Sequence, residues 1–149
     1  MRGVVLAVLL VACGPDDGAA PVFPDDYAAT YQEVRGCRFS LDHDLIRIRV
    51  LASPDALTPY TGRIQPFPTG AILLKEQYAD SDTRCEGPIV DFTVMAKLDV
   101  GSSPATLDWT WQKVGPDHQT VDTDIKACTQ CHDSCGKAPE GYDGTCTMP

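Results

Sequence analysis

The stretch Leu45-Ile46-Arg47-Ile48-Arg49-Val50-Leu51 decides the fold class of this 149-residue chain. Its apolar side chains alternate with arginines, and this period of two is typical of a β-strand that buries one face. Residues 54–60 then predict a single helical turn. Three more β-like runs, separated by turns rich in glycine and proline, cover residues 71–78, 89–98 and 107–114.

A short helix is predicted before the first strand. Tyr27, Tyr31 and Val34 recur at helical spacing, which indicates a helix over residues 27–34, and Gly36 provides its end. Strands joined by short connections and preceded by one helix are typical of an α+β domain. The sequence therefore predicts an α+β fold in which an N-terminal helix is followed by an antiparallel β-sheet of about four to five strands.

The C-terminal segment carries the motif Cys128-Thr129-Gln130-Cys131-His132. A C-x-x-C-H pentapeptide is typical of c-type haem attachment, because the two thiols add to the two vinyl groups and the adjacent histidine can reach the iron. We therefore predict a haem-binding C-terminal segment that holds one covalent haem c through Cys128 and Cys131. His132 is the predicted iron ligand.

Two other interpretations of this segment stay open at this point. Cys135 and Cys146 lie close by, so the cluster could form a zinc knuckle, or the C-x-x-C pair could be a disulfide or redox pair. Zinc sites usually show two spaced ligand pairs, whereas this chain has one C-x-x-C. Evidence for export from the cell favours haem.

The N-terminus indicates export. Residues 4–12 form an apolar run that is too short to span a bilayer and is typical of a signal peptide. Leu10-Val11-Ala12-Cys13 resembles a bacterial lipobox, which implies cleavage before Cys13 and a lipid on its sulfur. We expect a lipoprotein signal peptide over residues 1–12, a flexible tether over 13–26 and a haem domain over 27–149. The protein would be anchored to a bacterial membrane, with the outer membrane favoured, and would face the periplasm or the cell surface.

Charge and cysteine usage agree with this compartment. The formal net charge of −9 argues against nucleic acid as a partner and suits a basic electron-transfer partner. Of seven cysteines, one for lipid and two for haem leave Cys37, Cys85, Cys135 and Cys146, enough for two disulfides in an oxidising compartment. Three pairings are possible. Cys135 with Cys146 is favoured because both lie in one Gly/Pro-rich tail, which leaves Cys37 with Cys85.

Five stretches together carry a family resemblance. They are Ile48-Arg49-Val50, Pro68-Thr69-Gly70-Ala71-Ile72-Leu73-Leu74-Lys75-Glu76, Phe92-Thr93-Val94-Met95-Ala96-Lys97, Trp109-Thr110-Trp111 and the segment from Cys128 to His132. Through them the chain resembles the cytochrome P-460 family and its relative cytochrome c′-beta. The resemblance implies a five-coordinate haem with an open distal pocket that acts on small nitrogen species such as hydroxylamine and nitric oxide.

The resemblance also implies two catalytic residues. Lys75 matches the lysine that the oxidising branch of the family links to the porphyrin edge, and Arg49 matches an arginine of the distal pocket that would donate to a bound ligand. Lys75 shares a strand face with Ala71 and Leu73, so its amine could emerge from an apolar wall. Two alternatives remain. Lys75 could be an ordinary surface lysine, and Arg49 could share a solvated strand face with Arg47.

One departure from the family pattern concerns Thr93, which stands where the oxidising branch has an acidic residue. A hydroxyl is a poor general base near neutral pH, so we expect ligand binding rather than rapid hydroxylamine oxidation.

His43 and His118 lie among polar residues and are expected at the surface, not as second axial ligands. Met95 is expected to pack in the core.

Three classes of function therefore remain. The first is a lipid-anchored haem enzyme or sensor with an open site, which includes a hydroxylamine or nitric oxide oxidoreductase. The second is an electron-transfer cytochrome with both axial positions filled. The third is a disulfide-stapled structural lipoprotein without haem.

Overall fold

The computed structural model describes residues 19–41, 43 and 45–146. The predicted signal peptide and the lipid site at Cys13 lie outside the described residues. The described part of the predicted tether packs against the sheet, because the Phe23 side chain is 5% exposed and lies against the rings of Tyr27 and Phe92. The packed structure therefore begins before residue 27.

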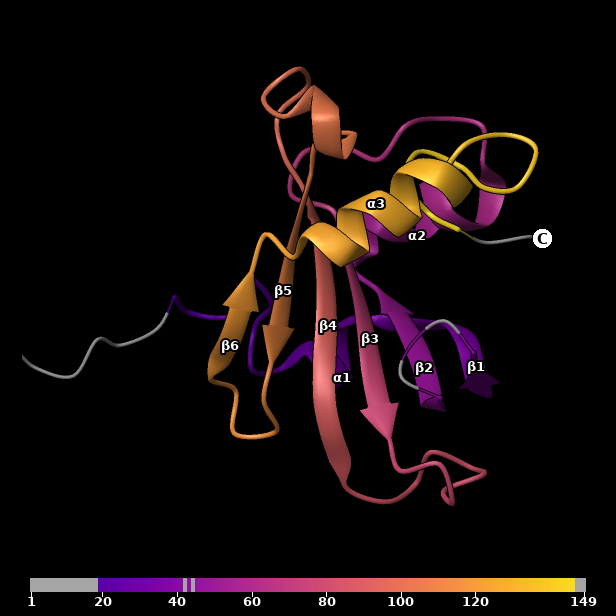
Figure 1. Cartoon of the computed structure of the whole chain (residues 1–149), viewed down its shortest axis with the longest axis vertical. Coiled ribbons are helices and arrows are strands. Elements are labelled where there is room, and N and C mark those ends of the chain that lie inside the picture. Colours follow the sequence, from indigo (N-terminus) through magenta and orange to yellow (C-terminus); the bar gives the residue numbers. More distant parts are fainter. Residues whose placement is uncertain (1–18, 42, 44, 147–149) are drawn as a thin grey trace, which may run out of the picture.

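The chain forms an α+β domain around one antiparallel sheet of six strands in the order β1-β2-β3-β4-β5-β6 (Figure 1). The elements in chain order are α1 (Tyr27–Thr30), β1 (Gln32–Ser40), β2 (Ile46–Ala52), α2 (Pro54–Gly62), β3 (Ile72–Tyr78), β4 (Ile89–Lys97), the 3₁₀-helix η1 (Pro104–Thr106), β5 (Trp109–Val114), β6 (Thr120–Thr123) and α3 (Lys126–Cys135). The predicted α+β class and antiparallel sheet are confirmed. The predicted strand number is too low.

The predicted N-terminal helix is the main error in the fold. Helix α1 has four residues, and the chain turns extended at Tyr31 (φ −89°, ψ 149°) to enter β1. Strand β1 pairs with β2 along its length, and register shifts on either side of Arg35 disrupt the alternation that would have identified a strand. Pairing with β2 therefore overrides the helical spacing of Tyr27, Tyr31 and Val34.

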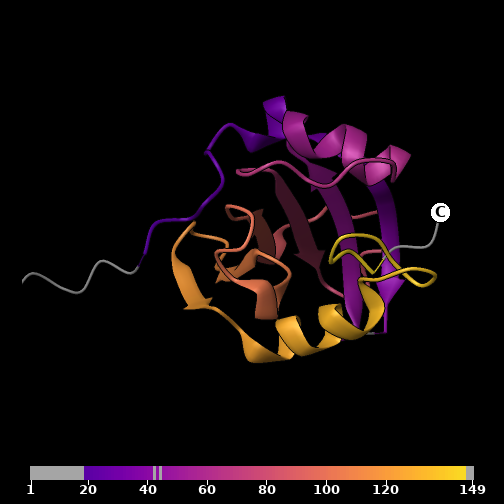
Figure 2. The ribbon, with the colours of Figure 1, turned by 90° about the horizontal axis from the view of Figure 1, so that it is seen from above.

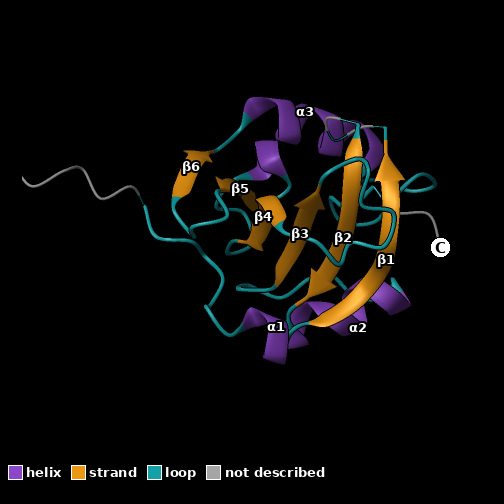
Figure 3. Cartoon of the chain, turned by 90° about the horizontal axis from the view of Figure 1, so that it is seen from below, coloured by secondary structure: helices purple, strands orange, loops and turns teal. Residues whose placement is uncertain are grey.

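The sheet has a core on each of its faces. On one face Trp109 and Trp111 pack with Leu73, Met95 and Tyr60. On the other face α1 and the segment before it cover a second cluster, formed by Phe23, Tyr27, Leu51, Leu74, Phe92, Val94 and Val114. Figures 2 and 3 show α3 on one side of the curved sheet and α1 on the opposite side. Adjacent residues of a strand therefore meet different environments.

The described residues contain two disulfides. Cys37–Cys85 joins β1 to the connection between β3 and β4, and Cys135–Cys146 closes the segment that follows α3. The predicted pairing of these four cysteines is confirmed. Within residues 19–41, 43 and 45–146, no helix is both long and apolar enough to cross a membrane.

Candidate functional site

A pocket lies between α3, the tip of the β1–β2 hairpin and one face of the sheet. Its empty volume is about 690 Å³ including the open mouth. The residues that line it come from seven elements, which are β1, β2, α2, β3, β4, β5 and α3, and from two loops. They are Arg38, His43, Val50, Tyr60, Leu73, Lys75, Thr93, Val94, Met95, Trp111, Cys128, His132, Thr145 and Cys146. These described lining residues include cations and imidazoles but no carboxylate.

His132 faces this pocket from α3 with its ring fixed. Its Nδ1 lies 2.6 Å from the Gly144 carbonyl oxygen, which can only accept, so Nδ1 carries the proton. The ring also packs edge-on against Trp111, with 5.9 Å between ring centroids. Burial lowers the pKa of His132, which keeps the imidazole neutral. Its Nε2 lone pair is then available to a metal, as in other histidine-ligated sites.

Cys128 and Cys131 lie about one helical turn apart on α3. Cys128 shares a helix face with His132, four residues later, whereas Cys131 is exposed. In the described part of the chain they are the cysteines outside the two disulfides. Burial raises the pKa of the Cys128 thiol. Cys135 and Cys146 are bonded to each other, so neither can supply a thiolate to a zinc knuckle. The described residues also contain no group of three or more His, Cys, Asp or Glu side chains arranged to hold a metal ion.

The residues of the pocket fit a haem group. The Cys128 thiol and the neutral imidazole of His132 line it from α3, the exposed Cys131 lies about one turn from Cys128 on the same helix, and the other walls of the pocket are largely apolar. Thr93 Oγ1 and Trp111 Nε1 are buried in the lining without a hydrogen-bond partner in the described part of the chain. A buried polar atom that lacks a partner costs about 1–3 kcal/mol, and a ligand in the pocket can satisfy such atoms.

Lys75 projects into the pocket from β3, as its strand face predicted. Its Nζ lies 2.5 Å from His43 Nε2, and His43 Nδ1 lies 2.7 Å from Ser40 Oγ. Burial, then the charge of Lys75, lowers the pKa of His43 to about 3, so His43 is neutral. The prediction of a surface position for His43 is wrong, because the β1–β2 hairpin folds its tip over the pocket. The sequence did not indicate this position, because the residues on either side of His43 are both aspartates.

Arg49 does not reach the pocket, which corrects its predicted distal role. It lies opposite Glu76 in the sheet register, on the face that α1 covers, and its Nε donates to Glu76 Oε2 at 2.6 Å. Glu76 is 2% exposed and also accepts from the hydroxyls of Tyr27 (3.0 Å) and Tyr78 (2.7 Å). The arginine that lines the pocket is Arg38 of β1, and burial, followed by the nearby Arg35, lowers its pKa.

Met95 is 8% exposed within the core next to the pocket, as expected for a packing residue, yet it also lines the pocket wall. His118 lies on the other side of the sheet, where its ring packs against Phe23 and Phe92 and its Nδ1 contacts Asp25. His118 is therefore far from the candidate iron ligand. His43 and Met95 are the potential second axial ligands among the described lining residues.

A pocket that joins a C-x-x-C-H helix to an antiparallel sheet defines a sheet-based haem protein. The sequence model of the family described as Cytochrome P460 matches residues 27–139. The chain therefore belongs to the cytochrome P460 family, and this membership indicates a haem protein that acts on nitrogen species. No curated protein matches the chain.

Proposed function

We propose that the chain holds one covalent haem c, attached through Cys128 and Cys131, with His132 as the axial ligand. The observation that carries this proposal is the geometry of His132, whose Nδ1–H is committed to Gly144 while its ring faces the pocket. When bound, the haem would supply iron that coordinates a small ligand and exchanges electrons. Family membership favours this function over a structural lipoprotein without haem.

The ligand proposed for the open side of the haem is a small nitrogen species such as nitric oxide or hydroxylamine. Arg38 and Lys75 supply N–H donors to this pocket, and both can bond a polarised N–O group. We assign to Arg38 the donor role expected for Arg49, because Arg38 is the arginine in the lining. Thr93 lacks a carboxylate, so binding is favoured over rapid oxidation.

An electron-transfer cytochrome is the second candidate, because His43 and Met95 both line the pocket and either could fill the sixth coordination position. The absorption spectrum of protein matured with covalent haem separates the two functions. We expect a high-spin spectrum and retention of haem peroxidase staining on a denaturing gel. A low-spin spectrum would show that both axial positions are filled and favour the electron-transfer function, and a gel without haem stain would reject the covalent attachment.

The pocket position of Lys75 makes the cross-link of the oxidising branch testable. The amine lies in the pocket wall, where it contacts His43 Nε2. Proteolysis followed by intact-mass measurement decides the question. A haem peptide still joined to the Lys75 peptide places the chain with the oxidising branch. Separate peptides place it nearer to cytochrome c′-beta, and Lys75→Ala should then leave the spectrum unchanged.

We further propose that the protein is exported and anchored by a lipid on Cys13, facing the periplasm or the cell surface. The lipobox-like sequence before Cys13 supports this location, as do the two disulfides, which form in oxidising compartments. A periplasmic electron-transfer partner of basic charge would suit the net charge of −9.

A further inference from the structure

The segment after α3 presents a backbone carbonyl to His132 from a tight turn. Tyr142 and Thr145 close this turn with two backbone hydrogen bonds, at 2.9 Å and 2.8 Å. The two central residues, Asp143 (φ 42°) and Gly144 (φ 85°), both have positive φ, as a type I′ turn requires, and Asp-Gly is a favoured pair for it. The Gly144 carbonyl accepts from His132. The turn thus determines where the acceptor of the Nδ1–H bond lies.

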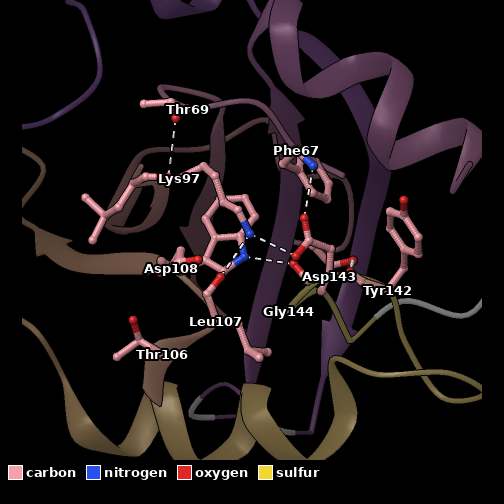
Figure 4. Close-up of polar contacts among 12 residues, drawn as sticks. Phe67, Thr69, Lys97, Thr106, Leu107, Asp108, Tyr142, Asp143 and Gly144 are labelled. Atoms are coloured by element: carbon pink, nitrogen blue, oxygen red, sulfur yellow. Dashed lines mark hydrogen bonds and ion pairs between the residues drawn. The ribbon is translucent and has the colours of Figure 1, made fainter. Parts of the chain in front are cut away.

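Asp143 fastens this turn to the end of the sheet (Figure 4). Its carboxylate accepts from Lys97 Nζ at 2.8 Å and from the Phe67 backbone N–H at 2.9 Å. Its backbone carbonyl accepts from Trp109 Nε1 at 2.8 Å. The Lys97 side chain is 6% exposed, so water screens this ion pair far less than it screens a surface pair. Three anchors from separate segments therefore converge on one residue.

Close packing leaves little room for the turn to shift. A Cβ atom on Gly144 would lie 2.6 Å from Trp109 Nε1, so the turn backbone is in direct contact with the indole. The Gly144 N–H also donates to the Gly136 carbonyl at 2.9 Å, which ties the turn to the end of α3. Lys97 donates to Leu107 and lies over the Trp109 ring. Hydrogen bonds and close packing therefore connect the sheet, the turn and α3.

We propose that Asp143 is a positioning residue for His132, which it holds through the Gly144 carbonyl. The proposal rests on the proposed ligation of haem iron by His132. A hydrogen bond from Nδ1–H to an acceptor increases the basicity of Nε2, and this outer contact tunes a metal bound there. A displaced carbonyl would weaken the bond. The iron–histidine bond should then weaken and the reduction potential should rise, since a less basic ligand stabilises the oxidised iron less.

The test compares three variants of the full chain matured with haem. Asp143→Asn removes the charge of the anchor, and Lys97→Met removes its cationic partner while keeping an apolar stem. Asp91→Asn is the matched control, because Asp91 forms another Lys–Asp pair of the sheet, with Lys113 at 3.2 Å, which makes no contact with the turn. Resonance Raman spectroscopy gives the iron–histidine stretching frequency, and redox titration gives the potential. We expect both test variants to lower the frequency and raise the potential, and the control to change neither.

The result that would overturn the proposal is a lower thermal midpoint in Asp143→Asn and Lys97→Met with the frequency and the potential unchanged, because the anchor would then be structural only. Nitrogen NMR of His132 in the haem-free chain is an independent arm. Wild type should show the Nδ1-protonated tautomer, and Asp143→Asn should show a mixture. If wild type attaches no haem, the proposed function fails, and an unchanged tautomer in the variant then overturns the positioning role separately.

Discussion

Replacement of Arg49 by Met tests whether this arginine serves the ligand pocket or the opposite face of the sheet. The substitution removes the charge-assisted hydrogen bond to Glu76 and leaves that carboxylate, which is 2% exposed, with two tyrosine hydroxyls as donors. Such a bond contributes about 1.5–3 kcal/mol, and removal of one partner of a fully buried pair costs about 3–5 kcal/mol. The Arg49 side chain is 33% exposed, so water moderates the loss.

We therefore expect Arg49→Met to lower the free energy of unfolding by about 2 kcal/mol, which lies inside the first range and below the second because the arginine is partly exposed. For a domain of this size the thermal midpoint should fall by about 4–8 °C. Urea unfolding followed by circular dichroism measures the change. Arg47→Met is the matched control from the same strand, since Arg47 lies over the partly exposed Phe39 ring and should contribute at most about 1 kcal/mol.

The same variants separate stability from ligand binding. Nitric oxide affinity of the haem-loaded protein, measured from the Soret band, should be unchanged in Arg49→Met and weakened in Arg38→Met, because Arg38 lines the pocket. The reasoning is refuted if Arg49→Met weakens nitric oxide binding while its unfolding free energy equals that of wild type. Arg49 would then act in the pocket as the sequence first implied.

Three further outcomes follow from the structure and the sequence. Because the folded state lowers the pKa of His43 from 6.5 to about 3, the unfolded chain binds more protons between these values, so the haem-free protein should lose stability as pH falls from about 6.5 toward 3. His43→Gln should flatten this dependence in urea titrations, and an unchanged slope would contradict it. Ser at both Cys135 and Cys146 opens a loop of 11 residues and should cost about 3 kcal/mol in the chain-entropy model, and an unchanged urea midpoint would contradict that. Cys13→Ala should release the protein from membranes on fractionation, whereas continued retention would reject the lipid anchor.

The strands that the sequence predicted are those with a strong local signal. Strict alternation identifies β2, and β-like runs bounded by turns rich in glycine and proline identify β3, β4 and β5, with observed bounds within about two residues of the predictions. Strand β6 was missed because it is a four-residue edge strand with polar residues at three positions, which carries no apolar period. Helix α3 was missed as a helix because its ten residues are cysteine-rich and leave no described side chain fully buried.

The site residues differ in the same way. Some were predictable from local sequence, and others depend on the pairing of distant segments. Cys128, Cys131 and His132 were predictable because the haem motif is contiguous in sequence. Arg38 and His43 were not, because they enter the pocket only through the pairing of β1 with β2, and the register shifts in that pair lie beyond local patterns. The assignment of Arg49 failed because both faces of the sheet bury apolar residues, so alternation could not tell which face holds the pocket.

Strand β3 shows how the two faces depend on each other. Lys75 lies opposite Val50 and Thr93 on the pocket side, and its neighbour Glu76 points to the α1 side. A slip of one residue would exchange their faces. Apolar pattern alone constrains this register weakly, since β3 is buried on both faces.

The polar contacts of Glu76 constrain the register of β3 where the apolar pattern does not. In a slipped register its carboxylate would leave the Arg49 guanidinium and the Tyr27 hydroxyl, both of which lie on the α1 side. Loss of hydrogen bonds to a buried charge is costly, so the observed register is strongly preferred. Arg49 therefore contributes to the pocket from the opposite face, because it helps to hold the strand in the register that keeps Lys75 in the pocket wall.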